Sequence, residues 1–157
     1  MKVYKFGGTS VGTVERMKHV AELISESAPK IVVLSATAGT TNHLEEIAAN
    51  LFSRDIEQAH EKITRLEFQF IDFANELLTD ESIKREAIDY ILDRFQRLWQ
   101  FINDEFTSVE EKEVLAQGEL ISTALLYFYL RERKIANWKI QCKLPPKTKR
   151  FCPLVLK

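Results

Sequence analysis

The residues that most constrain this fold are the first dozen, in which a short apolar segment runs directly into two glycines. Residues 2–6 have the pattern of a β-strand, Gly7 and Gly8 follow, and an amphipathic helix is predicted over 14–27. Glycines let the backbone approach a ligand closely, and the N–H groups ahead of a helix attract anions. Lys5 adds a positive charge, so the segment has the composition of a phosphate-binding loop. The alternative is a tight turn beside a surface lysine.

The segment 30–34 predicts how the chain continues. It is an unbroken run of aliphatic residues after Lys30, typical of a strand buried on both faces of a parallel sheet. A strand, a loop, a helix and a second strand in this order predict an α/β fold. Further helices are predicted over 44–52, 57–78, 82–103 and 108–134, and a strand over 135–140.

Two of these helices, 57–78 and 82–103, carry apolar residues at helical spacing and predict an α-hairpin. We interpret the apolar stripe as packing within the domain, and a cofactor or partner face is the alternative. Thr13 is the expected N-cap of the first helix, and a capping box of Ser108 and Glu111 is expected to open the last one.

The composition indicates an ordinary globular protein. The chain has 157 residues, 45% of them hydrophobic, and a net charge of −1. The length and the hydrophobic content are sufficient for one domain with a core. The nearly neutral net charge does not indicate a nucleic acid or membrane partner. No apolar run reaches the length of a membrane span or a signal peptide. Two cysteines, Cys142 and Cys152, give no disulfide framework, so a cytoplasmic location is expected.

A second motif, residues 35–42, directly follows the buried strand. It reads Ser-Ala-Thr-Ala-Gly-Thr-Thr-Asn and is dense in hydroxyls that can bind a carboxylate or phosphate. Loops at the carboxyl ends of parallel strands are where α/β proteins bind ligands. The alternative is a polar turn in which Thr41 or Asn42 caps the next helix.

A third motif, Gln-Gly-Glu-Leu-Ile-Ser at residues 117–122, lies inside the last predicted helix. A glycine there costs about 1 kcal/mol relative to alanine, which indicates that something approaches the backbone at Gly118. Glu119 is a candidate to pair with a ligand cation such as an α-amino group. The alternative is a solvent-facing glutamate beside a packing glycine.

Together the three motifs resemble aspartokinase, an enzyme of the amino acid kinase fold. The resemblance rests on Lys-Phe-Gly-Gly-Thr-Ser-Val, Val-Leu-Ser-Ala-x-x-Gly-x-Thr-Asn and Gln-Gly-Glu-Leu-x-Ser, and covers roughly residues 1–138. It implies an α/β fold, a three-layer αβα sandwich with a mainly parallel sheet. Of this fold the chain has the N-terminal, amino-acid-binding lobe, with the α-hairpin inserted at about 57–106.

The resemblance also implies a function. Aspartokinase transfers the γ-phosphoryl group of ATP, with Mg²⁺, to the β-carboxylate of L-aspartate, the first step of lysine, threonine and methionine biosynthesis. In this chain Lys5 is expected to stabilise the transferring phosphoryl group. The expected phosphate loop is Lys5, Gly7, Gly8, Thr9 and Ser10, and the expected aspartate-binding residues are Ser35, Thr41 and Glu119. No metal-ligating residue is expected, and the full-length form is expected to be a cytoplasmic homo-oligomer.

The segment 139–157 departs from the family pattern. It has six basic residues, no acidic ones, three of the four prolines and both cysteines. A frameshifted or misread 3′ end is one hypothesis, and a basic segment that contacts polyanions is the alternative. The family's nucleotide-binding half, with its Gly-Gly-Ser-Asp loop and an arginine for the aspartate carboxylate, has no counterpart here. We therefore expect little kinase activity from the chain alone, and exposed apolar surface that favours association.

Two other functions remain open at this stage. One is that of another amino acid kinase, acting on glutamate, acetylglutamate, carbamate or UMP. The other is that of a non-catalytic piece that binds or regulates full-length subunits.

Overall fold

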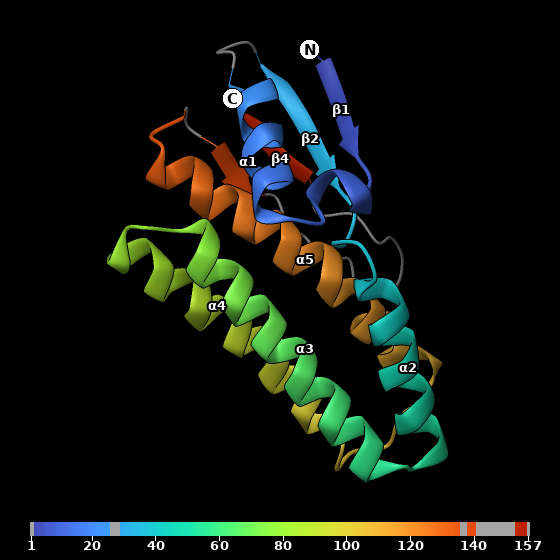
Figure 1. Cartoon of the computed structure of the whole chain (residues 1–157). Coiled ribbons are helices and arrows are strands. Elements are labelled where there is room, and N and C mark those ends of the chain that lie inside the picture. The colour runs from blue at the N-terminus through green and yellow to red at the C-terminus, as the bar shows by residue number, and fades with distance from the viewer. Residues whose placement is uncertain (1, 26–28, 136–137, 141–152, 157) are drawn as a thin grey trace.

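In the computed structural model, a small sheet lies against an array of long helices (Figure 1). The structure describes residues 2–25, 29–135, 138–140 and 153–156, so Cys142, Cys152 and most of the basic segment lie outside the described residues. The elements are β1 (Lys2–Phe6), the 3₁₀ helix η1 (Gly8–Val11), α1 (Val14–Leu23), β2 (Lys30–Leu34), α2 (Thr40–Ser53), α3 (Ile56–Leu77), α4 (Glu81–Gln100), α5 (Ser108–Glu132), β3 (Trp138–Ile140) and β4 (Pro153–Leu156).

The sheet has the strand order β1-β2-β4-β3. Strands β1 and β2 pair in parallel, with Phe6 opposite Leu34, as the opening of the sequence predicts. Strand β3 lies within the strand predicted at 135–140. Strand β4 pairs antiparallel with both β2 and β3. Local patterning did not predict β4, because its four residues are assigned by pairing with segments far away in the sequence.

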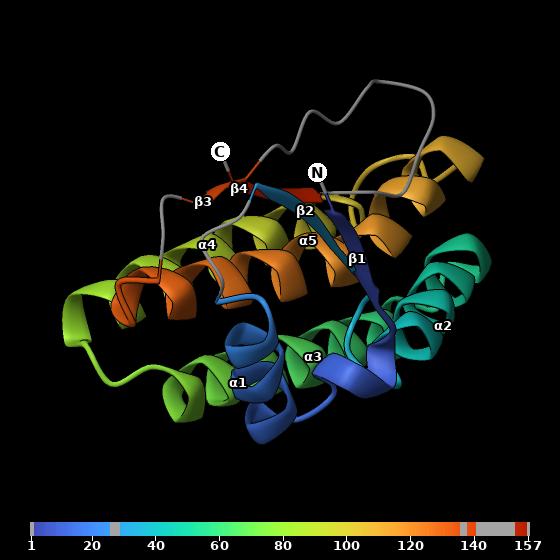
Figure 2. The same cartoon turned by 90° about the horizontal axis from the view of Figure 1, so that it is seen from above.

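The two faces of the sheet differ in their surroundings. Val32 and Leu34 are fully buried on the face that meets the helices. On the other face, Lys5 is exposed and Val3 keeps 65% of its surface in solvent. Figure 2 shows α1, α3 and α5 on the same side of the sheet. The open side of β1 is therefore where the first motif presents its lysine.

The predicted α-hairpin is present as α3 and α4, and aspartates start both of its helices. The Asp55 carboxylate accepts a hydrogen bond from the Gln58 amide at 3.2 Å. The Asp80 carboxylate accepts from the amides of Ser82 and Ile83 at 2.9 and 3.0 Å. Such caps satisfy amides that have no partner within the helix. The Asp80 cap lies between the two predicted helices, 57–78 and 82–103.

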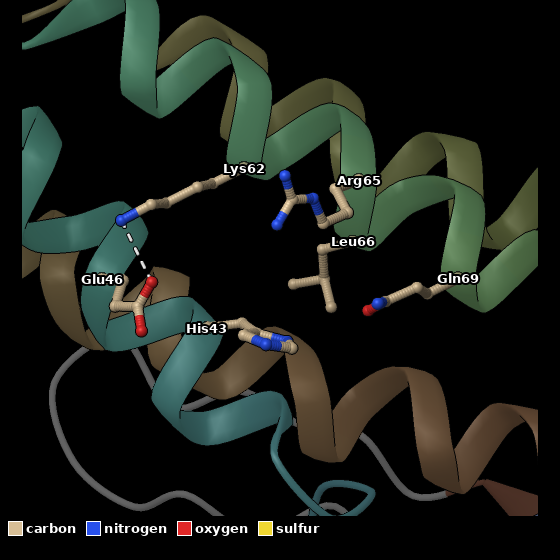
Figure 3. Close-up of a pocket in the computed structure, with 6 residues that line it drawn as sticks. All are labelled: His43, Glu46, Lys62, Arg65, Leu66 and Gln69. Carbon is tan, nitrogen blue, oxygen red and sulfur yellow. Dashed lines mark ion pairs between the residues drawn. The ribbon is translucent and has the colours of Figure 1, made fainter.

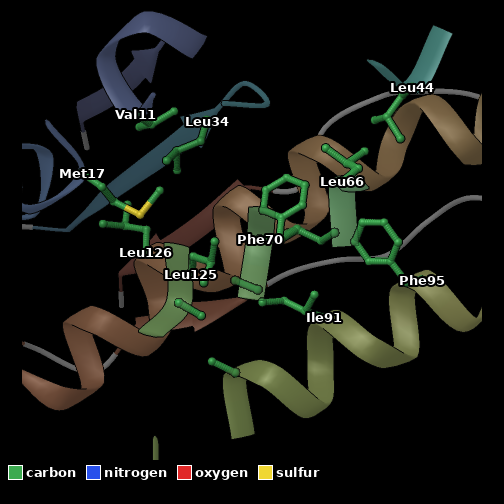
Figure 4. Close-up of a cluster of buried hydrophobic side chains, with 14 of the residues drawn as sticks. Val11, Met17, Leu34, Leu44, Leu66, Phe70, Ile91, Phe95, Leu125 and Leu126 are labelled. Carbon is green, nitrogen blue, oxygen red and sulfur yellow. The ribbon is translucent and has the colours of Figure 1, made fainter. Parts of the chain in front are cut away.

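One hydrophobic core joins the hairpin to the α/β part of the chain. Figure 4 shows side chains of both parts packed together. The labelled residues are Val11, Met17, Leu34, Leu44, Leu66, Phe70, Ile91, Phe95, Leu125 and Leu126. The apolar stripe of the hairpin is thus used for packing within the domain, which confirms that interpretation over a cofactor face.

Helix α5 is capped one residue earlier than predicted. Its capping box is formed by Thr107 and Glu110, so the predicted pair Ser108 and Glu111 is wrong. Thr107 has the extended backbone of an N-cap, and its hydroxyl accepts a hydrogen bond from the Val109 amide at 3.2 Å. The predicted cap of α1 is confirmed, with the Thr13 hydroxyl accepting from the Arg16 amide at 3.3 Å. None of the helices in the described ranges combines the length and the hydropathy needed to span a bilayer.

Candidate functional site

The first motif forms a bend between β1 and α1. Lys5 is exposed near the end of β1, and Gly7 continues in extended backbone before η1. The Ser10 amide donates a hydrogen bond to the Gly7 carbonyl at 2.9 Å and closes the 3₁₀ turn. The Arg16 guanidinium donates to the Thr9 carbonyl at 2.8 Å, so α1 holds the loop in place. Arg16 is a positioning residue that the sequence motifs did not single out.

The two glycines of this loop have opposite surroundings. A Cβ atom on Gly8 would lie 2.7 Å from the Ala36 carbonyl oxygen, a distance that real side chains do not adopt. A Cβ atom on Gly7 would meet no heavy atom within 4 Å. Gly8 thus allows contact between the first and second motifs, while the Gly7 side of the loop is open. The open side and the exposed Lys5 suit a phosphate group, which a backbone-lined loop can approach closely.

The second motif extends from the end of β2 and packs on the first. The Ser35 amide donates to the Phe6 carbonyl at 3.0 Å, continuing the parallel pairing of the two strands. Gly39 adopts the left-handed conformation at φ 84° and is the N-cap of α2. The expectation that Thr41 or Asn42 caps this helix is wrong, because the helix already begins at Thr40.

The hydroxyls of the second motif divide into internal and accessible ones. Thr37 and Thr40 are buried and share a hydrogen bond of 2.6 Å between their hydroxyl oxygens. Thr41 is exposed, and Ser35 is half-buried. The two hydroxyls expected to bind a substrate are therefore the ones that the loop does not bury.

The third motif packs directly against the second. A Cβ atom on Gly118 would lie 2.8 Å from both Ala36 Cβ and Thr40 Cγ2. Four residues further along α5, the Ser122 hydroxyl donates to the Ser35 carbonyl at 2.9 Å. The close neighbour that the glycine indicates is therefore the second loop. Glu119, the residue after Gly118, is half-buried.

The structure thus brings the three motifs together at the carboxyl ends of β1 and β2. Ala36, in the second motif, contacts the first motif at the Gly8 backbone and the third motif at the Gly118 backbone. The sequence analysis included Ala36 and Thr40 in the second motif but assigned a role to neither. Among the described residues, no three His, Cys, Asp or Glu side chains are close enough together to hold a metal ion.

Comparison with known proteins agrees with this arrangement. Residues 1–143 match the amino acid kinase family. The lysine-sensitive aspartokinase 3 of Escherichia coli is 33% identical over 138 residues, which are 87% of this chain and 30% of that protein. The aspartokinase of Chlamydia trachomatis is 35% identical over 134 residues, covering 81% of this chain and 27% of that protein. The chain spans about 30% of the length of the curated relatives it matches.

Solved structures give the same result. The crystal structure of E. coli aspartokinase III in complex with lysine and aspartate superposes with a TM-score of 0.70 at 29% identity, covering 86% of this chain and 30% of that one. The Clostridium acetobutylicum aspartate kinase superposes with a TM-score of 0.60 at 19% identity, covering 83% of this chain and 29% of that one, a likeness of fold alone. The resemblance drawn from the three motifs is confirmed, and the chain belongs to the amino acid kinase family.

Proposed function

We propose that this chain is the amino-acid-binding part of an aspartate kinase, which transfers the γ-phosphoryl group of ATP to the β-carboxylate of L-aspartate. The observation that carries the proposal is the contact of all three motifs around Ala36. A Cβ at Gly8 or Gly118 would clash with that residue, at 2.7 and 2.8 Å. These contacts support the proposal because they bring the first loop, the second loop and the segment of α5 that carries the third motif close together.

Each group in this site has a proposed role. Lys5 neutralises charge on the transferring phosphoryl group, and the backbone of residues 7–10 binds the phosphates of ATP. Ser35 and Thr41 bind a carboxylate of aspartate, and Glu119 binds its α-ammonium group. The acceptor carboxylate is already ionised at neutral pH, so the reaction needs positioning and charge neutralisation but no general base.

The described residues fit the two cofactors unequally. The open side of Gly7 and the exposed Lys5 fit a nucleotide phosphate. Within the described ranges, no group of three or more His, Cys, Asp or Glu side chains is placed to hold a metal ion. Mg²⁺ usually needs only one or two carboxylates beside phosphate oxygens, and we propose that it is bound mainly through the ATP phosphates. When bound, MgATP supplies the phosphoryl group. We further propose that the whole protein is a cytoplasmic homo-oligomer, and that the 157-residue chain alone has little kinase activity.

The test is a titration of the ¹⁵N-labelled chain with L-aspartate, followed by NMR. We expect shifts at Thr41 and Glu119, and much weaker shifts with L-glutamate, whose side chain is one methylene longer. Glu119→Gln should weaken aspartate binding by about ten-fold or more, because a hydrogen bond to a charged group contributes about 1.5–3 kcal/mol. Glu111→Gln, in the first turn of the same helix, is the matched control and should leave binding unchanged.

Two outcomes count against the proposal. One is equal binding of L-aspartate and L-glutamate, which would favour a different acceptor within the family. The other is unchanged aspartate affinity in Glu119→Gln with the fold intact, which would remove the proposed ammonium contact.

A further inference from the structure

A second candidate site lies between α2 and α3, on residues that the proposed function does not use. It is a pocket of about 250 Å³ lined by His43, Glu46, Lys62, Arg65, Leu66 and Gln69. Figure 3 shows side chains from both helices facing this space. Leu66 is buried and forms an apolar part of the lining, while the other five residues bring polar groups. Five of the six lining residues are polar or charged, so the pocket suits a charged ligand better than the mostly apolar ligands of typical binding pockets.

Positive charge predominates in this lining. Lys62 and Arg65 are permanent cations at neutral pH, His43 is an imidazole, and Glu46 is the one acidic residue. The Lys62 ammonium lies 3.0 Å from the Glu46 carboxylate. This contact, with weaker effects of His43 and Arg65, lowers the pKa of Glu46, so its carboxylate stays ionised at neutral pH. An anion must therefore compete with Glu46 for Lys62.

Arg65 keeps donors for a ligand. Its guanidinium pairs with Glu61, one turn earlier on α3, whose carboxylate accepts a hydrogen bond from Nη2 at 2.7 Å. A guanidinium has five N–H donors in a planar fork that suits the oxygens of phosphates and carboxylates. Arg65 is also largely exposed, with 66% of its side chain in solvent, so its fork can reorient toward an occupant.

We propose that this pocket binds a small molecule that carries a phosphate group. Arg65 and Lys62 would contact the phosphate oxygens, His43 and Gln69 would donate further hydrogen bonds, and Leu66 would contact the carbon part of the ligand. The inference does not depend on the proposed kinase function, since no residue of the pocket belongs to the three motifs. The pocket and the candidate active site are nevertheless linked by α2, which begins at Thr40 and carries His43 one turn later.

The test uses the full chain and inorganic phosphate as the probe, with chloride at equal ionic strength as the reference. The chain has 3 histidines, so ring resonances in ¹H–¹³C NMR spectra report the position of binding. We expect phosphate to shift the His43 ring and leave His19, on α1, unchanged. Glycerol phosphate, tested in parallel, should bind more tightly than inorganic phosphate if Leu66 contacts the carbon part.

Charge variants test the sign of the interaction. Arg65→Gln should weaken phosphate binding by about ten-fold, since hydrogen bonds to charged groups are the strong ones. Glu46→Gln should strengthen it, because it removes the competing carboxylate and frees Lys62. Arg94→Gln is the matched control, because it removes one positive charge on α4, where Arg94 pairs with Asp93.

Three results would overturn the proposal. The first is a His43 ring resonance that shifts no more with phosphate than with chloride at the same ionic strength. The second is weaker phosphate binding in Glu46→Gln, which would show that the Glu46 carboxylate does not compete with the anion for Lys62. The third is an equal loss in Arg65→Gln and Arg94→Gln, which would indicate nonspecific charge attraction.

Discussion

Gly118→Ala is the substitution whose effect can best be worked out from the structure. A Cβ atom at this position would lie 2.8 Å from Ala36 Cβ, 2.8 Å from Thr40 Cγ2 and 3.3 Å from Leu44 Cδ1. Ala36 Cβ is attached directly to the backbone and cannot rotate away. Thr40 is held by its 2.6 Å hydrogen bond to Thr37. Relief of the clash therefore requires α5 and the second loop to move apart.

Two free-energy terms of opposite sign decide the result. Alanine in place of a mid-helix glycine stabilises a helix by up to about 1 kcal/mol. Overpacking of a well-packed site costs about 1–3 kcal/mol, and two contacts below 3 Å put this site in the upper part of that range. We expect Gly118→Ala to lower the free energy of unfolding by about 1–2 kcal/mol, although a glycine-to-alanine change in a free helix would raise it.

Urea unfolding followed by circular dichroism measures this change, with the slope checked for equality between variants. Gly7→Ala is the matched control, since a Cβ there meets nothing within 4 Å and the φ of −77° suits any residue. We expect the control to be neutral or slightly stabilising. A Gly118→Ala protein as stable as the wild type, or more stable, would refute the close contact between α5 and the second loop.

Two further predictions concern stability. The Glu132 carboxylate loses solvent by burial, which raises its pKa, but hydrogen bonds from Thr79 and Asp80 outweigh this and lower the pKa below 4.5. Its stabilising effect is therefore complete above pH 4.5 and lost as the pH falls through the lowered folded pKa. Glu132→Gln should lower the unfolding free energy at pH 7 by about 1 kcal/mol at most, because solvent weakens a partly exposed contact. In urea titrations this difference should shrink toward pH 3, and a difference that grows would contradict the assignment. Lys30 is only 1% exposed, and its ammonium donates to the Ile24 carbonyl at 3.1 Å. Lys30→Ala should cost about 2 kcal/mol and Lys30→Met less, because methionine keeps the buried stem filled. Equal thermal shifts for the two variants would show that the stem does not contribute.

Helix and strand positions were largely predictable because they depend on local patterns. The spacing of apolar residues located the hairpin, which is observed as α3 and α4 within one to three residues of the predicted ends. Caps were less predictable, since several neighbouring residues can serve. Thr107 caps α5 in place of Ser108, because the N-cap is the residue whose backbone is extended just before the helix.

The candidate site was predictable in its groups but not in its contacts. The sequence showed that two glycines, several hydroxyls and a carboxylate lie at loops and in a helix. It did not show that Gly8 and Gly118 both pack on Ala36, because these residues are far apart along the chain. Nor did it reveal the α2–α3 pocket, whose six lining residues come from two helices and form no motif.

By itself, the sequence determined the two segments that form β1 and β2, the helices of the hairpin and the three motifs, because each depends on residues close together in the chain. The tertiary structure alone decided which glycines are required for packing and which hydroxyls remain accessible. Thr37 and Thr40 are buried and share a hydrogen bond between their hydroxyls. Thr41, in the same run of small residues, is exposed. The physical reason is that the burial of a residue depends on which distant segments pack against it. Neighbouring residues of similar chemistry can therefore differ in burial, and the local sequence does not show which of them is covered.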